Sequence, residues 1–167
     1  MIRRVGEPAF YPVVVFDLDG TLLRGTTVSL LLAQWLGQTE EIAELERAFH
    51  AHEISNSVVA DTSAGWLAGQ STADAWLLSG KVTRYFDEHD KARFVEDWCA
   101  QNGFSMSQVA AVGDSRSDVP LFRRAGTSIA LNATPDAREA ATHTLDTDDL
   151  CDVLALLQPV SDDRTAE

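Results

Sequence analysis

Residues 13–23 read VVVFDLDGTLL, a run of β-branched apolar residues that ends in two carboxylates one residue apart, Asp17 and Asp19. An apolar run without alternating polar positions is typical of a strand buried on both faces, as in a parallel sheet. Burying a charge without a partner costs a large free energy. The sequence therefore predicts that a cationic group meets these carboxylates where the strand ends.

The second half of the chain alternates between strand-like and helical patterns. Strands are expected at 81–86, 108–114, 127–132 and 142–146, and helices at 88–103, 115–126, 134–141 and 147–158. This alternation indicates an α/β fold with a Rossmann-like parallel sheet flanked by helices. Ligands of such sheets bind at the carboxyl ends of the strands.

Between Thr27 and about Leu78 the pattern is helical throughout, which predicts a small all-helical insertion after the first strand. Trp35, Trp66 and Trp76 fall within it and are interpreted as core residues. The two cysteines of the chain, Cys99 and Cys151, also lie in apolar stretches and are interpreted as core thiols.

The chain has 167 residues, a formal net charge of −13 and a sequence pI of about 4.5. Such a charge repels nucleic acid and anionic membranes, so neither is expected as a partner, whereas divalent cations are attracted. No apolar run matches a signal peptide or a membrane span. A cytoplasmic location is the expectation.

Two further acids extend the first pair. Asp114 ends the predicted strand 108–114, and Asp118 follows four residues later. If this strand neighbours the first one, up to four carboxylates crowd one small volume and cannot all stay ionised alone. A hard divalent cation relieves this crowding, and all-oxygen ligands of this kind suit magnesium.

Lys91 belongs to the predicted helix 88–103. It lies on the same face as Val95 and Trp98, toward the core, and in the first turn, where the helix dipole disfavours a cation. A lysine in this position needs a carboxylate or a phosphate opposite it. The alternative is a lysine that extends past the end of the helix into solvent.

Several stretches resemble the haloacid dehalogenase-like hydrolases, in particular their phosphoserine-phosphatase-like branch. FDLDGTL at 16–22 is similar to the first motif of the family, Lys91 to the third, and GDSRSD at 113–118 to the fourth. The stretch 125–141 also follows that branch. The resemblance implies phosphoryl transfer through an aspartyl-phosphate by a magnesium-dependent phosphomonoester hydrolase.

The resemblance also implies a role for each matching residue. Asp17 is the nucleophile, and Asp19 is the general acid and base. Asp17, the backbone carbonyl of Asp19 and Asp114 hold the metal ion. Lys91 holds Asp17 and the phosphate oxygens, and Asp118 supports the metal site.

For the domains, the same resemblance implies a hydrolase core of residues 1–24 and 77–158 with a helical cap of residues 25–76. Residues 159–167 are expected to be a frayed tail.

One motif of the family has no clear counterpart. A Ser or Thr that donates to the phosphate normally ends another parallel strand, and Ser79 is the one candidate here. The alternative, which we favour, is that about two strand–helix units are absent near Trp76–Leu77. The first strand would then lose a neighbour, and its apolar edge could support a homo-oligomer.

The substrate is expected to be a small phosphorylated metabolite, but the residues argue against phosphoserine. The phosphoserine-specific members that the chain resembles carry a glutamate for the amino group where this chain has Thr26, and an asparagine where it has Ser117. They also carry an arginine in the cap for the carboxylate, whereas no Lys or Arg occurs here from Ala48 to Gly80. The first alternative is that the chain is a non-catalytic, internally truncated member of the family, which acts as a binding protein or an assembly protein. A receiver-like domain is a weaker alternative, because there the accepting aspartate lies on a later strand.

Overall fold

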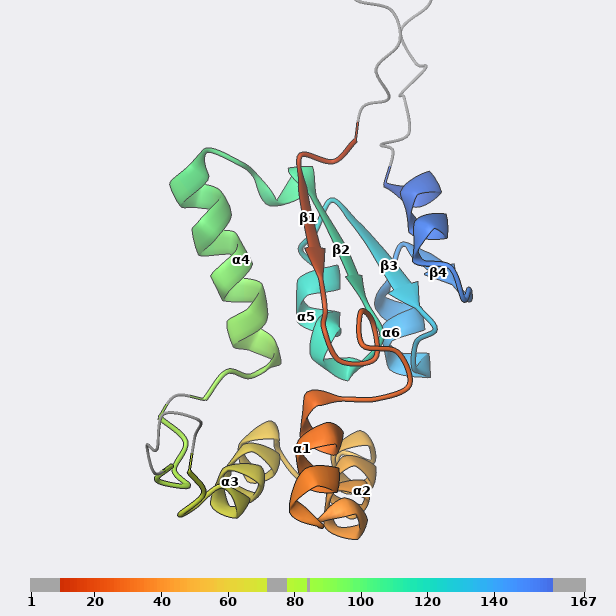
Figure 1. The fold of residues 1–167 in the computed structure, drawn as a ribbon. Helices are drawn as coiled ribbons and strands as arrows, with labels where there is room; N and C mark the ends of the chain where they lie inside the picture. Colours follow the sequence, from red (N-terminus) through yellow and green to blue (C-terminus); the bar gives the residue numbers. More distant parts are fainter. Residues whose placement is uncertain (1–9, 72–77, 84, 158–167) are drawn as a thin grey trace, which may run out of the picture.

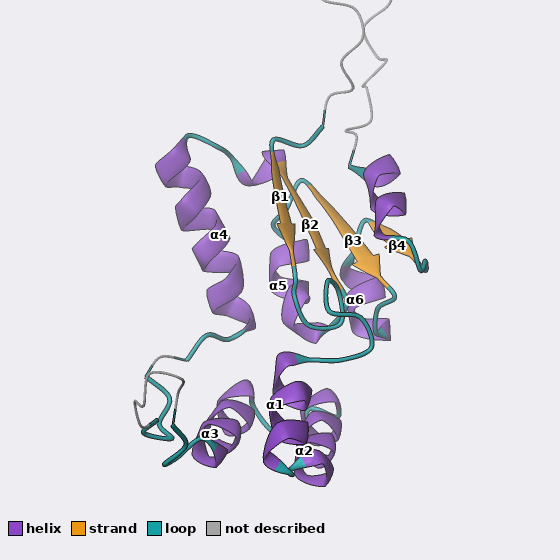
Figure 2. Cartoon of the chain, viewed as in Figure 1, coloured by secondary structure: helices purple, strands orange, loops and turns teal. Residues whose placement is uncertain are grey.

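The computed structural model describes residues 10–71, 78–83 and 85–157. Within these ranges a four-stranded parallel sheet in the order β1-β2-β3-β4 is flanked by helices, which confirms the predicted fold class (Figure 1, Figure 2). The elements are β1 (Val13–Phe16), α1 (Val28–Leu36), α2 (Thr39–His50), α3 (Asn56–Trp66), α4 (Glu88–Asn102), η1 (Met106–Gln108), β2 (Val109–Gly113), η2 (Arg116–Asp118), α5 (Val119–Phe122), β3 (Thr127–Leu131), α6 (Pro135–Ala140), β4 (His143–Leu145) and η3 (Leu150–Leu156).

The two central strands are buried on both faces. On one face α4, α5 and α6 pack against the sheet through residues such as Ala92 and Leu121. On the other face η3 covers the sheet with Val153, against Ile129. Every residue of β2 and β3 is buried as a result, which is the burial that apolar runs without alternation predict.

Helices α1, α2 and α3 follow β1 and form a separate helical block at the carboxyl end of the strands (Figure 1). The first helix begins at Thr27, whose hydroxyl accepts a hydrogen bond from the N–H of Leu30 at 2.9 Å. It ends at Gly37, which has a φ of 74°. Local capping thus sets where the first helix of the block begins and ends, beyond the carboxyl ends of β1 and β2 (Figure 1).

Two sequence predictions, for the stretch 81–86 and for Trp35, are wrong, and so is the prediction for Cys151 described below. Residues 81–83 and 85–86 form no strand: Phe86 packs on Phe94 of α4, and the hydroxyl of Tyr85 donates to Asp61 of α3. The stretch is thus held by side-chain contacts and not by backbone hydrogen bonds to a neighbouring strand. Trp35 is 69% exposed, because α1 packs through Ala33 on its other side.

Cys99 is buried as predicted, but Cys151 is exposed on η3, whose core contact is Val153. Trp66 is half-buried. Trp76 and the predicted tail 159–167 lie outside the described residues. No helix in the described ranges combines the length and apolarity that a membrane span requires.

Gly126 joins α5 to β3 at a close backbone approach. A Cβ there would overlap the carbonyl oxygen of Ser107, which belongs to η1 and cannot move like a side-chain end. We expect Gly126→Ala to lower the free energy of unfolding by about 1–3 kcal/mol, measured by urea denaturation. Gly65→Ala is the matched control, because a Cβ in α3 meets no atom within 4 Å. Equal stability losses in the two variants would contradict this account.

Candidate active site at the carboxyl ends of β1 and β2

The ends of the two neighbouring strands bring the predicted acids together. The N–H of Asp17 donates to the carbonyl of Val112 at 2.8 Å, which continues the parallel pairing of β1 with β2. Asp17 and Asp114 therefore leave the sheet at the same edge. One carboxylate oxygen each from Asp17, Asp114 and Asp118 lies within 4.8 Å of the others.

The ammonium group of Lys91 meets two of these acids. Its Nζ atom lies 2.5 Å from Oδ1 of Asp17 and also donates to Asp118. The side chain is only 17% exposed. Burial opposes the charged form, but the charges of Asp118 and Asp17 together outweigh burial and raise the pKa of Lys91. The prediction of an anion opposite Lys91 is confirmed, and the solvent-directed alternative is wrong.

Asp118 is fixed by the backbone around it. Its Oδ2 atom accepts hydrogen bonds from the N–H groups of Asp114, at 3.0 Å, and Ser115, at 3.2 Å, and its side chain is 1% exposed. A Cβ at Gly113 would overlap this carboxylate. With one oxygen bound to backbone and the other to Lys91, Asp118 orients its neighbours.

The carboxylate of Asp114 is held by the loop that follows β1. The hydroxyl of Thr21 donates to its Oδ1 atom at 3.1 Å. Gly20 has a φ of 82° and leaves room where a Cβ would overlap the carboxylate. Burial and, next, the charge of Asp118 raise the pKa of Asp114 to about 6. The sequence analysis missed Thr21, although its place after Gly20 in a conspicuous loop was a usable signal.

Asp19 lies outside the group of three clustered acids and contacts the helical block instead. Its Oδ1 atom accepts a hydrogen bond from the N–H of Val28 at 2.8 Å, at the start of α1. The carboxylate is therefore placed between the sheet edge and the helical block.

A cavity of about 230 Å³ joins the sheet edge to the helical block. Asp17, Asp19 and Asp114 line one side of it. The opposite side is lined from the helical block, by residues that the sequence analysis did not select: Glu46, Phe49, His50, Asn56 and Val59. The sequence offered no signal for them, because their contribution depends on how the block folds over the sheet.

Comparisons with known proteins agree with this geometry. A sequence model described as haloacid dehalogenase-like hydrolase matches residues 82–155. A phosphoserine phosphatase of Streptococcus thermophilus is 37% identical over 85 residues, which cover 50% of this chain and 40% of that protein. Over these residues the chain is similar to the haloacid dehalogenase-like hydrolases.

Two further matches are to proteins named as phosphoserine phosphatases, and the structural one shows a likeness of fold. A phosphoserine phosphatase of Lactococcus lactis subsp. lactis is 28% identical over 113 residues, which cover 66% of this chain and 52% of that protein. A structure titled as a phospho-aspartyl intermediate analogue of phosphoserine phosphatase has a TM-score of 0.77 at 17% identity, covering 87% of this chain and 98% of that chain. The chain spans about half, or less, of these curated relatives' length.

Ser79, the one sequence candidate for the family's second motif, is not among the residues that line the cavity around Asp17. It is exposed, and its hydroxyl accepts a hydrogen bond from the N–H of Lys81. Among the described residues, β1 forms an edge of the sheet and pairs with β2 alone. Both observations agree with the expected loss of a segment.

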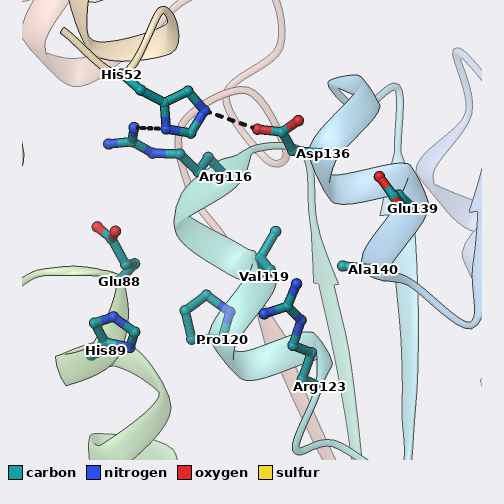
Figure 3. A pocket seen from close by; sticks show the side chains of 10 residues that line it. All are labelled: His52, Glu88, His89, Arg116, Val119, Pro120, Arg123, Asp136, Glu139 and Ala140. Carbon is teal, nitrogen blue, oxygen red and sulfur yellow. Dashed lines mark hydrogen bonds and ion pairs between the residues drawn. The ribbon is translucent and has the colours of Figure 1, made fainter.

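A larger cavity, of about 550 Å³, lies where the helical block contacts η2 and α6 (Figure 3). His52 bridges the two parts: its Nδ1 atom lies 2.6 Å from Nη1 of Arg116, and its Nε2 atom lies 3.2 Å from Oδ2 of Asp136. The guanidinium of Arg116 also lies 4.1 Å from the ring centroid of Phe49. These contacts join the helical block to the part of the chain that forms the sheet, beside the site.

Proposed function

We propose that the chain is a magnesium-dependent phosphomonoester hydrolase that acts through an aspartyl-phosphate on Asp17. The observation that carries this proposal is the cluster of three carboxylates with the Lys91 ammonium bound to two of them. A carboxylate fixed by a buried ammonium at the end of a strand is positioned for nucleophilic attack.

In the first step an oxygen of Asp17 forms a bond to phosphorus while the bond from phosphorus to the leaving oxygen breaks. Asp19 donates a proton to that leaving oxygen, and the alcohol departs. In the second step Asp19 takes a proton from a water molecule whose oxygen attacks phosphorus. Inorganic phosphate leaves, and Asp17 is restored.

The donor set fits magnesium, since every group that the cluster offers is a carboxylate oxygen. Asp17 and Asp114, with the backbone carbonyl of Asp19, would hold the ion, while Asp118 is committed to Lys91 and the backbone. The bound ion supplies charge neutralisation, which lets an anionic nucleophile approach an anionic phosphate. Lys91 supplies the same kind of stabilisation from the protein itself.

The substrate is proposed to be a small phosphorylated metabolite other than phosphoserine. The cavity of about 230 Å³ accommodates a small leaving group, and among the described residues that line it none is a Lys or Arg that could hold a carboxylate. Glu46 lines the wall supplied by the helical block and is bound there by the hydroxyl of Thr27. Its negative charge disfavours an acidic leaving group.

A second candidate function is that of a non-catalytic binding protein or assembly protein. The open edge of β1 and the absence of Ser79 from the cavity favour it. Phosphate release from p-nitrophenyl phosphate, with magnesium or with EDTA, separates the two functions. Turnover that requires magnesium supports the hydrolase. Absence of turnover at every metal concentration would contradict it and favour the second candidate.

Magnesium binding is expected to depend on pH through Asp114. Because its pKa in the metal-free chain is raised to about 6, the carboxyl must release a proton before it can bind a cation. Affinity should level off above about pH 7 and fall about tenfold for each pH unit below 6. Calorimetric titration with magnesium chloride in buffers of different ionisation enthalpy measures both the affinity and the released proton. An affinity independent of pH would contradict this assignment.

A further inference from the structure

The outer edge of β1 carries backbone groups without a strand partner. The N–H of Asp17 points to β2, and N–H groups alternate in direction along a strand, so those of Val14 and Phe16 point away from β2. Among the described residues no strand lies on that side (Figure 1). An unpaired strand edge is a template for pairing with another chain.

An apolar groove of about 470 Å³ runs along this edge, between β1 and α4. Four exposed apolar side chains dominate it, and we call them the edge patch: Val14, Phe86, Phe94 and Trp98. Phe94 is 61% exposed and Val14 36%, and the two aromatic neighbours are close to half exposed.

The aromatic side chains of the edge patch are already ordered by contacts within the chain. The rings of Phe86 and Phe94 meet edge to face, with centroids 6.2 Å apart. Trp98 stacks on Phe104 with a centroid distance of 6.0 Å. A partner that covers these rings therefore loses little side-chain entropy in ordering them.

We propose that the edge patch is the contact surface of a homodimer in which two copies of the chain bury it against each other around a twofold axis. A twofold axis needs the same patch on both copies and runs the two β1 strands antiparallel. In that orientation unpaired edge groups can bond reciprocally. Among the described residues that line the groove, Lys91 is the one that is charged, and Asp17 and Asp118 already balance its charge.

The edge patch supplies only part of the surface that each copy would bury in a stable dimer. Its four side chains expose about 400 Å² per copy, taking roughly 200 Å² for an exposed aromatic side chain. This is about half of the ~800 Å² that each partner contributes to a stable interface. The remainder would come from the strand backbone and from the polar side chains around the groove.

Sedimentation equilibrium of the purified chain over a wide concentration range tests the proposal. The wild type is expected to approach twice 18.2 kDa as the concentration rises. Phe94→Glu and Trp98→Glu are each expected to weaken dimerisation at least ~30-fold. Trp35→Glu is the control, because Trp35 is more exposed than Phe94 or Trp98 but lies on α1 outside the edge patch, and this variant should dimerise like the wild type.

Salt gives a second readout. Each copy carries a net charge of −13, so salt that screens this repulsion should strengthen an apolar dimer, whereas a dimer held by ion pairs would weaken. Circular dichroism checks that each variant is folded. A wild type that stays monomeric at every concentration and salt level would overturn the proposal. So would folded Phe94→Glu and Trp98→Glu variants that dimerise like the wild type.

Discussion

Asp17→Asn is expected to lower magnesium-dependent phosphate release from p-nitrophenyl phosphate by at least about 10³-fold. An amide oxygen carries no negative charge and is a poor nucleophile toward phosphorus. The substitution keeps the size of the side chain and its place at the end of β1, where the backbone N–H bonds to Val112. The fold should therefore survive, and the loss should appear in kcat.

The control for this experiment is Asp97→Asn, which removes an exposed carboxylate on α4 outside the cavity. Its activity should equal that of the wild type. Asp19→Asn adds a distinction between roles, because loss of the general acid and base slows both steps by about 10²–10⁴-fold without removing the nucleophile. An Asp17→Asn variant with wild-type turnover would refute covalent catalysis at this residue.

Lys91→Met is expected to be the most destabilising substitution at the site. Removing the ammonium leaves the carboxylates of Asp17 and Asp118 without their partner, and Asp118 is fully buried. Breaking a buried ion pair from one side costs about 3–5 kcal/mol. Urea denaturation without divalent metal measures this loss. Phosphatase activity should fall with it, because Lys91 also orients Asp17.

Arg93→Met is the matched control on the same helix, since Arg93 is exposed and pairs with Asp90 at the surface. Its cost should stay within about 1 kcal/mol. In a double-mutant cycle, Asp118→Asn should recover part of the stability lost in Lys91→Met, because it removes the uncompensated charge. Equal costs for Lys91→Met and Arg93→Met would show that the buried ammonium has no special partner.

The sequence was sufficient to predict the acid cluster because its signals are local. Apolar runs that end in acids mark strand ends, so Asp17 and Asp114 could be assigned to one sheet edge. Helical spacing placed Lys91 on the inner face of α4, and the structure confirms its anionic partners. Among the described residues β1 also lies at the edge of the sheet, as predicted.

The parts that could not be predicted depend on packing between distant segments. Trp35 is apolar and lies on a helix, but its exposure is decided by which side of α1 meets α2 and α3. The stretch 81–86 has the composition of a strand, but Tyr85 and Phe86 make side-chain contacts with α3 and α4, which the sequence alone does not show. His50 and Glu46 reach the cavity only because the helical block folds over the sheet.

The most direct test is anomalous diffraction from crystals of the wild type grown with manganese, a divalent cation with ligand preferences close to those of magnesium. We expect an anomalous peak within coordinating distance of the Asp17 and Asp114 carboxylates, with the Lys91 ammonium still bound to Asp17. A peak at other acids, or a Lys91 side chain turned into solvent beside an empty cluster, would contradict the account.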